Sequence, residues 1–189
     1  MPGYVYFILG LAWAVWLAPF IFRSKRPGKA QEVKVRARWG IVLVAVAFSV
    51  LWQGKFWERE TPLWKLVLAS SFFAAGWALS WTAVHALGRQ WRIDAGLNPD
   101  HHLVRSGPYA LVRHPIYTSM LCVLIGTGLI VTPWPLFVCA LVLFIIGTEI
   151  RVRTEEALLA SRFGEEFAKY RRRVPAYIPG LQFIRHERI

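Results

Sequence analysis

Residues 101–117 are unusually dense in side chains that bind ligands, and read HHLVRSGPYALVRHPIY. Gly107-Pro108 predicts a turn, and Pro115 is favoured at the first position of a helix, so His114 is expected at the helix N-cap. Free backbone N–H groups and the positive helix end there can hold an anionic ligand group. One such residue more often only anchors a helix end at the membrane surface. The density of the whole group favours a binding site.

A second polar segment, residues 149–156, reads EIRVRTEE and follows a long apolar run. If that run continues as a helix, Arg151 and Glu155 are four residues apart and share one face. Glu149 and Arg153 make a similar pair, and Glu149 lies at the membrane end, where an ionisable group is costly unless paired or functional. On spacing alone, ordinary ion pairs on an exposed helix explain this segment better than a catalytic role does.

Apolar helices must position both segments. The chain has 189 residues, of which 56% are hydrophobic and only 18% charged, too little polar surface for a soluble domain of this length. A spanning helix needs about 20 mostly apolar residues. We therefore predict an all-α, integral membrane helical bundle, a single domain over residues 1–189. About five transmembrane helices are expected, at residues 4–22, 39–57, 63–87, 116–131 and 134–150, with most tryptophans near their ends.

The formal net charge of +12 indicates orientation and partners. Basic residues concentrate in the loop 23–38, in the segment 88–115 and in the C-terminal tail. The positive-inside rule places all three on the cytoplasmic side, so a multi-pass protein with its N-terminus outside and its C-terminus in the cytoplasm is expected. Membrane lipids are the expected partners of this charge. No motif supports nucleic-acid binding, and Cys122 and Cys139 lack metal-ligand spacing, so no metal site is predicted.

The tail after residue 156 predicts an amphipathic helix. Leu159, Phe163, Phe167 and Tyr170 form an apolar stripe at helical spacing, and most of the arginines lie off it. Such an element could lie on the membrane or cover a site, although most such stripes serve packing alone. We assign none of its residues a catalytic role.

Taken together, these blocks resemble the isoprenylcysteine carboxyl methyltransferase family. The order and spacing of several blocks carry the resemblance, which covers about residues 85–180; the first two predicted spans carry no signature. Small prokaryotic members of that family are about this long, which makes a prokaryotic cell membrane the expected location. The matching residues are His101, Leu103, Val104, Gly107, Pro108, Tyr109, Arg113, His114, Pro115, Tyr117, Arg151, Glu155, Glu156, Phe163, Gly164, Tyr170, Val174 and Pro175.

The resemblance implies a multi-span helical fold with a cytoplasmic cofactor-binding region formed by segments 88–117 and 149–180. It implies that S-adenosylmethionine is the cofactor and that Arg151 is tied to substrate and catalysis. A further polar cofactor contact of the family has no clear match upstream of residue 101, and Gln90 is only a candidate for it. The residues expected to bind the cofactor are His101, His102, Leu103, Val104, Tyr109, His114, Pro115, Ile116, Tyr117 and Glu155.

The implied activity is methyl transfer from S-adenosylmethionine to a lipophilic, membrane-embedded acceptor, either a small molecule or a prenylated substrate. A carboxylate acceptor, as in isoprenylcysteine O-methylation, is already ionised and needs no general base. Catalysis then reduces to alignment in a dry site, with Arg151 positioning the carboxylate. An amine acceptor, as in a phospholipid N-methyltransferase, would instead need a proton sink, for which Glu149 and Glu156 are available.

Two readings compete with a methyltransferase. NADPH-dependent sterol and steroid reductases of membranes resemble the same C-terminal blocks, but their element typically reads His-Pro-Asn-Tyr and is soon followed by an acidic residue. Here the element reads His114-Pro-Ile-Tyr-Thr-Ser-Met120, with neither feature, and the chain is shorter than a typical sterol reductase. A non-catalytic membrane scaffold would require the whole polar cluster to be structural.

Overall fold

The computed structural model describes residues 1–22, 36–58, 60–92, 96 and 101–180, and within them the regular elements are helices. Five α-helices form the bundle: α1 (Gly3–Phe22), α2 (Arg36–Leu51), α3 (Leu63–Leu87), α4 (Pro115–Val131) and α5 (Trp134–Arg173). Three short 3-10 turns join them: η1 (Phe56–Glu58), η2 (Gly88–Gln90) and η3 (Gly107–Ala110). The predicted all-α bundle is therefore confirmed.

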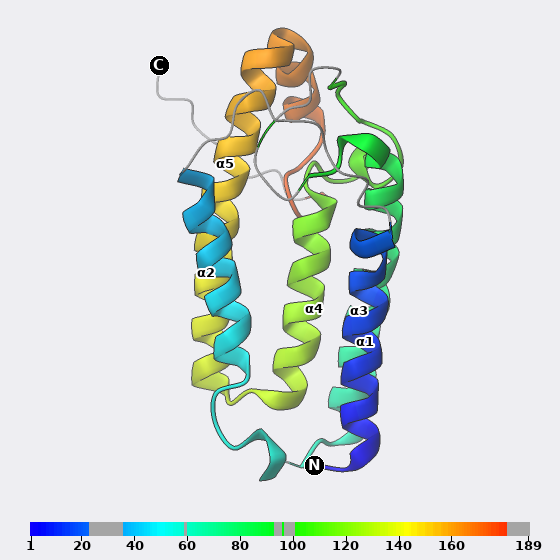
Figure 1. Cartoon of the computed structure of the whole chain (residues 1–189), viewed down its shortest axis with the longest axis vertical. Coiled ribbons are helices and arrows are strands. Elements are labelled where there is room, and N and C mark those ends of the chain that lie inside the picture. The colour runs from blue at the N-terminus through cyan, green and yellow to red at the C-terminus, as the bar shows by residue number, and fades with distance from the viewer. Residues whose placement is uncertain (23–35, 59, 93–95, 97–100, 181–189) are drawn as a thin grey trace.

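The helices run nearly parallel to one axis, with α2 beside α5, α4 in the middle, and α1 and α3 on the other side (Figure 1). The N-terminus and η1 lie at one end of the bundle, and the loops between α3 and α4 lie at the other. The C-terminal half of α5 rises past that second end. The two polar segments of the sequence therefore meet at one end of the molecule.

Composition and surface suit a membrane environment. Helices α1, α3 and α5 are long and apolar enough to cross a bilayer, whereas α2 and α4 are shorter apolar helices. Large apolar side chains point outward from these helices, for example Phe7, Val138 and Ile145. An outward-facing apolar surface of this kind is stable against lipid and unfavourable in water. The chain thus has the features of an integral membrane protein.

Two predicted spans end differently in the structure. The span expected at residues 39–57 is helical only as far as Leu51, and Gly54 follows with φ +103°, a left-handed conformation that a continuing α-helix excludes. The apolar run that begins at Trp134 continues as one helix far beyond residue 150, to a break at Gly164, where φ is +48°. The second polar segment is therefore helical, as its spacing required.

Several tryptophans tie helices together through their indole N–H groups. The indole N–H groups of Trp13 and Trp16 donate to Thr127 Oγ1 and Ser119 Oγ on α4, each at 3.2 Å. Trp77 donates from α3 to the carbonyl of Ala12 at 2.9 Å. In an apolar surrounding each indole donor needs such a partner, so these bonds fix the position of α1 against α3 and α4.

Glycines allow α2 and α5 to approach closely beside the polar segment. A Cβ atom on Gly40 would lie 2.6 Å from the carbonyl oxygen of Gly147 and 2.6 Å from Cγ of Arg151. A Cβ on Gly147 would lie 2.8 Å from the carbonyl oxygen of Gly40. Both distances are shorter than any normal contact, so the side chain of Arg151 can lie against α2 only because residue 40 has no side chain.

Candidate active site

A cavity of about 700 Å³ lies at the loop end of the bundle and receives residues from all five helices. One part of its wall is polar and is built from the segment before α4 and from the part of α5 that carries Arg151 and Glu155. The other part is apolar and is built from α1, α2 and α4. Its lining comprises Trp16, Leu17, Phe20, Ile21, Ile41, Val44, Leu87, Gln90, Trp91, Arg92, Gly96, His101, Leu103, Val104, Tyr109, Arg113, His114, Ile116, Tyr117, Met120, Arg151, Glu155, Leu158, Leu159 and Tyr170.

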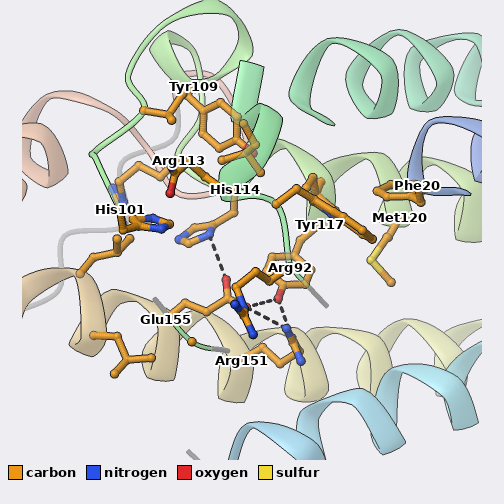
Figure 2. Close-up of a pocket in the computed structure, with 18 of the residues that line it drawn as sticks. Phe20, Arg92, His101, Tyr109, Arg113, His114, Tyr117, Met120, Arg151 and Glu155 are labelled. Carbon is orange, nitrogen blue, oxygen red and sulfur yellow. Dashed lines mark hydrogen bonds and ion pairs between the residues drawn. The ribbon is translucent and has the colours of Figure 1, made fainter. Parts of the chain in front are cut away.

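Arg151, Tyr117 and Glu155 form a closed triangle of hydrogen bonds in this wall (Figure 2). The Arg151 Nε group donates to the Tyr117 hydroxyl at 2.6 Å, and that hydroxyl donates to Glu155 Oε1 at 2.5 Å. Arg151 Nη2 closes the triangle on the same Glu155 oxygen at 3.0 Å. Arg151 is only 6% exposed, so its guanidinium is held rigidly where the polar wall meets the apolar one.

The start of α4 is covered by the C-terminal segment 174–177. The backbone N–H groups of Arg113 and His114 donate to the carbonyls of Pro175 and Ala176, at 2.8 and 3.0 Å. Those two amides, which immediately precede the first helical residue, are therefore used within the chain. Thr118 Oγ1 donates to the Tyr177 carbonyl at 2.9 Å and extends the contact. We call residues 174–177 the strap.

Behind the cavity, Glu156 connects the loop to α5. Its Oε1 atom accepts from Arg113 Nε at 3.0 Å and Nη2 at 2.7 Å, and His114 Nε2 lies 3.1 Å from it. The other Arg113 nitrogen, Nη1, donates to the carbonyls of Arg171 and Val174. Burial alone would raise the pKa of Glu156, but His114 and Arg113 outweigh it and the pKa lies below its ordinary value. Glu156 is therefore an ionised, buried carboxylate.

Two tyrosines close the polar side of the cavity. The Tyr170 hydroxyl donates to the Tyr109 carbonyl at 2.6 Å and so joins α5 to η3. Burial raises the pKa of Tyr170 to about 12, and burial followed by the nearby Glu155 carboxylate raises the pKa of Tyr109 well above its usual range. Both remain neutral phenols at physiological pH, able to donate hydrogen bonds and to present an aromatic face.

Gln90 contributes an acceptor that has no partner among the described residues. It ends η2, is 7% exposed, and lines the cavity. Its Nε2 lies 3.1 Å from His102 Nδ1, while its Oε1 is buried without a hydrogen bond within the described part of the chain. A buried carbonyl of this kind normally has a donor, so the atom marks a position where a bound ligand would donate.

The cavity brings most of the predicted site residues together. Eight of the ten expected cofactor residues line it, as does Arg151. The exceptions are His102, which is exposed and lies beside Gln90, and Pro115, which is buried in the first turn of α4. Residues 93–95 and 97–100, part of the predicted segment 88–117, lie outside the described residues.

Sequence reasoning missed the apolar wall, to which α1 and α2 contribute Trp16, Phe20, Ile41 and Val44. No signal could have found these positions, because apolar residues in a predicted span look alike whether they face lipid, a neighbouring helix or a cavity. Arg113 and Glu156 belonged to the recognised blocks, but their pairing depends on how α5 lies against the loop before α4.

Comparison with known proteins identifies a family and several relatives of this chain. Residues 67–161, half of the chain, match the family described as "Isoprenylcysteine carboxyl methyltransferase (ICMT) family". The cobalt-zinc-cadmium resistance protein CzcN of Cupriavidus metallidurans is 31% identical over 79% of this chain and 65% of its own. The protein-S-isoprenylcysteine O-methyltransferases of Schizosaccharomyces pombe and Homo sapiens are 34% and 28% identical, over 59% and 69% of this chain.

The chain spans about half the length of those two methyltransferases, 48% and 47%, so the match covers only part of each of these relatives. The matched region, residues 67–161, contains most of α3, all of α4 and the part of α5 that carries Arg151 and Glu155. It leaves out α1 and α2, which supply much of the apolar wall. On this match, the chain belongs to the isoprenylcysteine carboxyl methyltransferase family.

Proposed function

We propose that this protein is a methyltransferase that uses S-adenosylmethionine to methylate a lipophilic acceptor in the membrane, and that the acceptor group is a carboxylate. One observation carries the proposal: ten of the eighteen residues that match the family's blocks line a single cavity with an apolar wall from α1 and α2. A methyl donor with many polar groups and an acceptor with a long apolar part need such a two-sided site.

The residues of the polar wall fit S-adenosylmethionine. The cavity, at about 700 Å³, falls within the range of roughly 300–1,000 Å³ typical of pockets that enclose a ligand of that size. Gln90 Oε1 is a buried acceptor that suits a ligand amino group. Tyr109 and His101 offer aromatic faces to an adenine or a cation, and Glu155 is an acceptor for a ribose hydroxyl or an amino group.

When bound, S-adenosylmethionine supplies a methyl group on a positively charged sulfur, which is a good leaving group. The chain's own residues then have to bind the acceptor, align it and exclude water. A carboxylate needs no base, and Arg151 is the buried cation positioned to hold it. Tyr117 and Glu155 fix the guanidinium through Nε and Nη2, so its orientation is set before the acceptor arrives.

The apolar wall supports a lipophilic acceptor that enters from the membrane. Leu17 and Ile21 on α1 and Ile41 on α2 line the cavity, and these apolar side chains are 39%, 68% and 39% exposed. An exposed apolar lining of this kind supports an opening of the cavity toward lipid on the side of α1 and α2. An acyl or prenyl chain could lie there while its carboxylate extends toward Arg151.

Methyl transfer can be tested in vesicles that contain the purified protein, S-adenosylmethionine labelled in its methyl group, and a prenylated cysteine with a free carboxylate as probe. The expected product is an ester that releases labelled methanol in alkali, and the same probe with an amidated carboxylate should remain unlabelled. Alkali-stable label in phosphatidylethanolamine would show that the acceptor group is an amine and not a carboxylate. Absence of label in both the probe and the lipid would contradict the proposed activity.

A further inference from the structure

Glu156 is buried beside the site but does not line the cavity. It is 4% exposed, and its Oε1 atom faces three nitrogens, two of Arg113 and one of His114. The preceding residue, Glu155, faces the cavity on a different side of the helix. The reacting groups therefore cannot touch Glu156, and any influence on a bound ligand has to pass through a neighbour.

The contact with His114 determines which ring nitrogen carries hydrogen. A carboxylate can only accept, so the His114 Nε2 atom, 3.1 Å from Glu156 Oε1, must be the N–H donor. Nδ1 lies on the opposite side of the ring, 3.9 Å from Glu155 Oε2 and beyond hydrogen-bond distance. Figure 2 shows this ring directed at Glu155 in the cavity wall.

Several charged and aromatic groups surround His114. The charged groups that face it are Arg113 from its own loop and Glu155, Glu156 and Arg151 from α5. They pair with one another, Arg113 with Glu156 at 2.7 Å and Arg151 with Glu155 at 3.0 Å. Tyr117 on α4 and Tyr177 in the strap also face it, with ring centroids 6.0 and 6.1 Å away. Burial and the nearby carboxylates Glu156 and Glu155 raise the pKa of Tyr177, which stays neutral.

We propose that Glu156 is a positioning residue that fixes His114 in the Nε2–H tautomer and so presents Nδ1 to the cavity as a hydrogen-bond acceptor for an amino group of the bound ligand. The assignment rests on the proposed function, because S-adenosylmethionine has two such donors, its α-amino group and its adenine amino group. Arg113 serves Glu156 by keeping it ionised and by fixing one oxygen toward the ring.

The tautomer of the unmodified protein tests the proposal without any variant that might fail to fold. Protein labelled with ¹⁵N-histidine distinguishes a protonated nitrogen from one with a lone pair, and His114→Asn identifies the His114 signals. The expected spectrum at neutral pH shows Nε2 protonated and Nδ1 with a lone pair. The opposite tautomer, or a doubly protonated ring, would overturn the proposal.

Two substitutions separate positioning from mere packing. Glu156→Gln keeps a carbonyl that can accept from Nε2–H but loses the charge that pairs with Arg113, whereas Glu156→Met keeps the approximate size and loses the acceptor. We expect both to lower the melting temperature, and only Glu156→Met to weaken binding of S-adenosylhomocysteine, by about tenfold. Equal affinity in all three proteins, or equal loss in both variants, would overturn the assignment. Glu165→Gln, which removes an exposed carboxylate of α5, is the matched control.

Ligand analogues identify the donor. S-adenosylhomocysteine without its α-amino group and S-adenosylhomocysteine without its adenine amino group are compared in the unmodified protein and in His114→Leu. One of the two analogues should bind the unmodified protein about tenfold more weakly than S-adenosylhomocysteine does. The same analogue should bind His114→Leu with the affinity that it has for the unmodified protein. Independent losses for both analogues would overturn the assignment of Nδ1. Failure of any form of this ligand to bind the unmodified protein would instead overturn the proposed function, and this assignment with it.

Discussion

At the scale of single residues, the account depends on how Arg151 is held. A buried guanidinium needs acceptors for its donors, and here Tyr117 and Glu155 each accept one of them. Because these two partners also line the cavity, the same contacts that stabilise the buried charge orient it toward a ligand. A lysine ammonium cannot reproduce that planar arrangement.

Arg151→Lys should therefore reduce the methyl-transfer rate by about 100-fold, because a shift of about 1 Å in a positioning group has an effect of that order. Affinity for S-adenosylmethionine should change much less, because most of the proposed cofactor contacts are made by other residues. Initial rates and calorimetric titration measure the two quantities. Arg153→Lys is the control, since Arg153 is exposed, pairs with Glu149 and lies outside the cavity lining. Loss of cofactor binding with an unchanged rate constant for transfer would contradict the assigned role.

The ionisation of Glu156 should make the stability of the fold depend on pH. Its pKa in the folded protein lies below the ordinary value of 4.5, so its ionised form stabilises the fold. That stabilisation is fully present above 4.5 and is lost as the pH falls through the lowered pKa. The difference in melting temperature between the unmodified protein and Glu156→Gln should accordingly be largest near neutral pH and should shrink on acidification below 4.5. A difference that stays constant or grows in acid would contradict this.

The sequence could predict most of the polar residues but not their partners. His114, Tyr117 and Glu155 were recognisable because they stand in dense blocks with characteristic spacing. Glu156 belonged to a recognised block and was a candidate proton sink, but its pairing with Arg113 joins positions 43 residues apart and could not be predicted. For Arg151 and Glu155, spacing alone favoured an ordinary surface ion pair, and only the burial of Arg151 distinguishes them from one.

At the scale of elements, the contact between α2 and α5 sets the position of Arg151. Gly40 and Gly147 remove the side chains that would otherwise separate these helices. Helix α2 lies outside the region that matches the family, yet it supplies both this close contact and part of the apolar wall. The site therefore requires an element that carries no recognisable motif.

Gly40→Ala should destabilise the fold by about 1–3 kcal/mol, because the added methyl group would overlap Arg151 Cγ and the Gly147 carbonyl. It should also lower the transfer rate more than it lowers cofactor affinity, since the displaced group is Arg151. Thermal unfolding and initial rates in detergent measure both effects. Gly10→Ala on α1, where an added Cβ meets nothing within 4 Å, should leave both unchanged. If the two variants behaved alike, the close contact would have no role in positioning.

The elements that could be predicted are those that leave a recognisable pattern in the sequence. The apolar runs predicted all five α-helices of the described residues, and Pro115 and Pro133 lie at the helix starts. The early end of α2 was missed because the apolar residues Phe56 and Trp57 follow Gly54 and suggest a continuing span. The strap was missed as well, since backbone hydrogen bonds hold it to Arg113 and His114 and such bonds leave no pattern in the side chains.

At the scale of the whole molecule, charge distinguishes the two ends of the bundle. The end with the cavity carries Arg105, Arg162 and the basic run at the end of α5, whereas Lys55 and Glu58 form a pair at the opposite end. The predicted loop 23–35 adds further basic residues but lies outside the described residues. By the positive-inside rule we expect the cavity to face the cytoplasm.

Cysteine accessibility tests that orientation. In a protein whose Cys122 and Cys139 are replaced by serine, Gly3→Cys and Ser161→Cys place one exposed thiol at each end. A charged, membrane-impermeant maleimide added to intact spheroplasts should label Gly3→Cys and reach Ser161→Cys only after lysis. The reverse pattern would place the cavity outside the cell and contradict the predicted topology.

The central claim concerns the whole cavity, namely that it holds a methyl donor and not a nicotinamide dinucleotide. The most direct measurement is calorimetric titration of the detergent-purified protein with S-adenosylmethionine and, separately, with NADPH. The account predicts saturable binding of S-adenosylmethionine, competition by S-adenosylhomocysteine, loss of binding in Tyr117→Ala, and no binding of NADPH. Binding of NADPH alone would contradict the account and support a reductase, and binding of neither ligand would leave the polar wall with a structural role only.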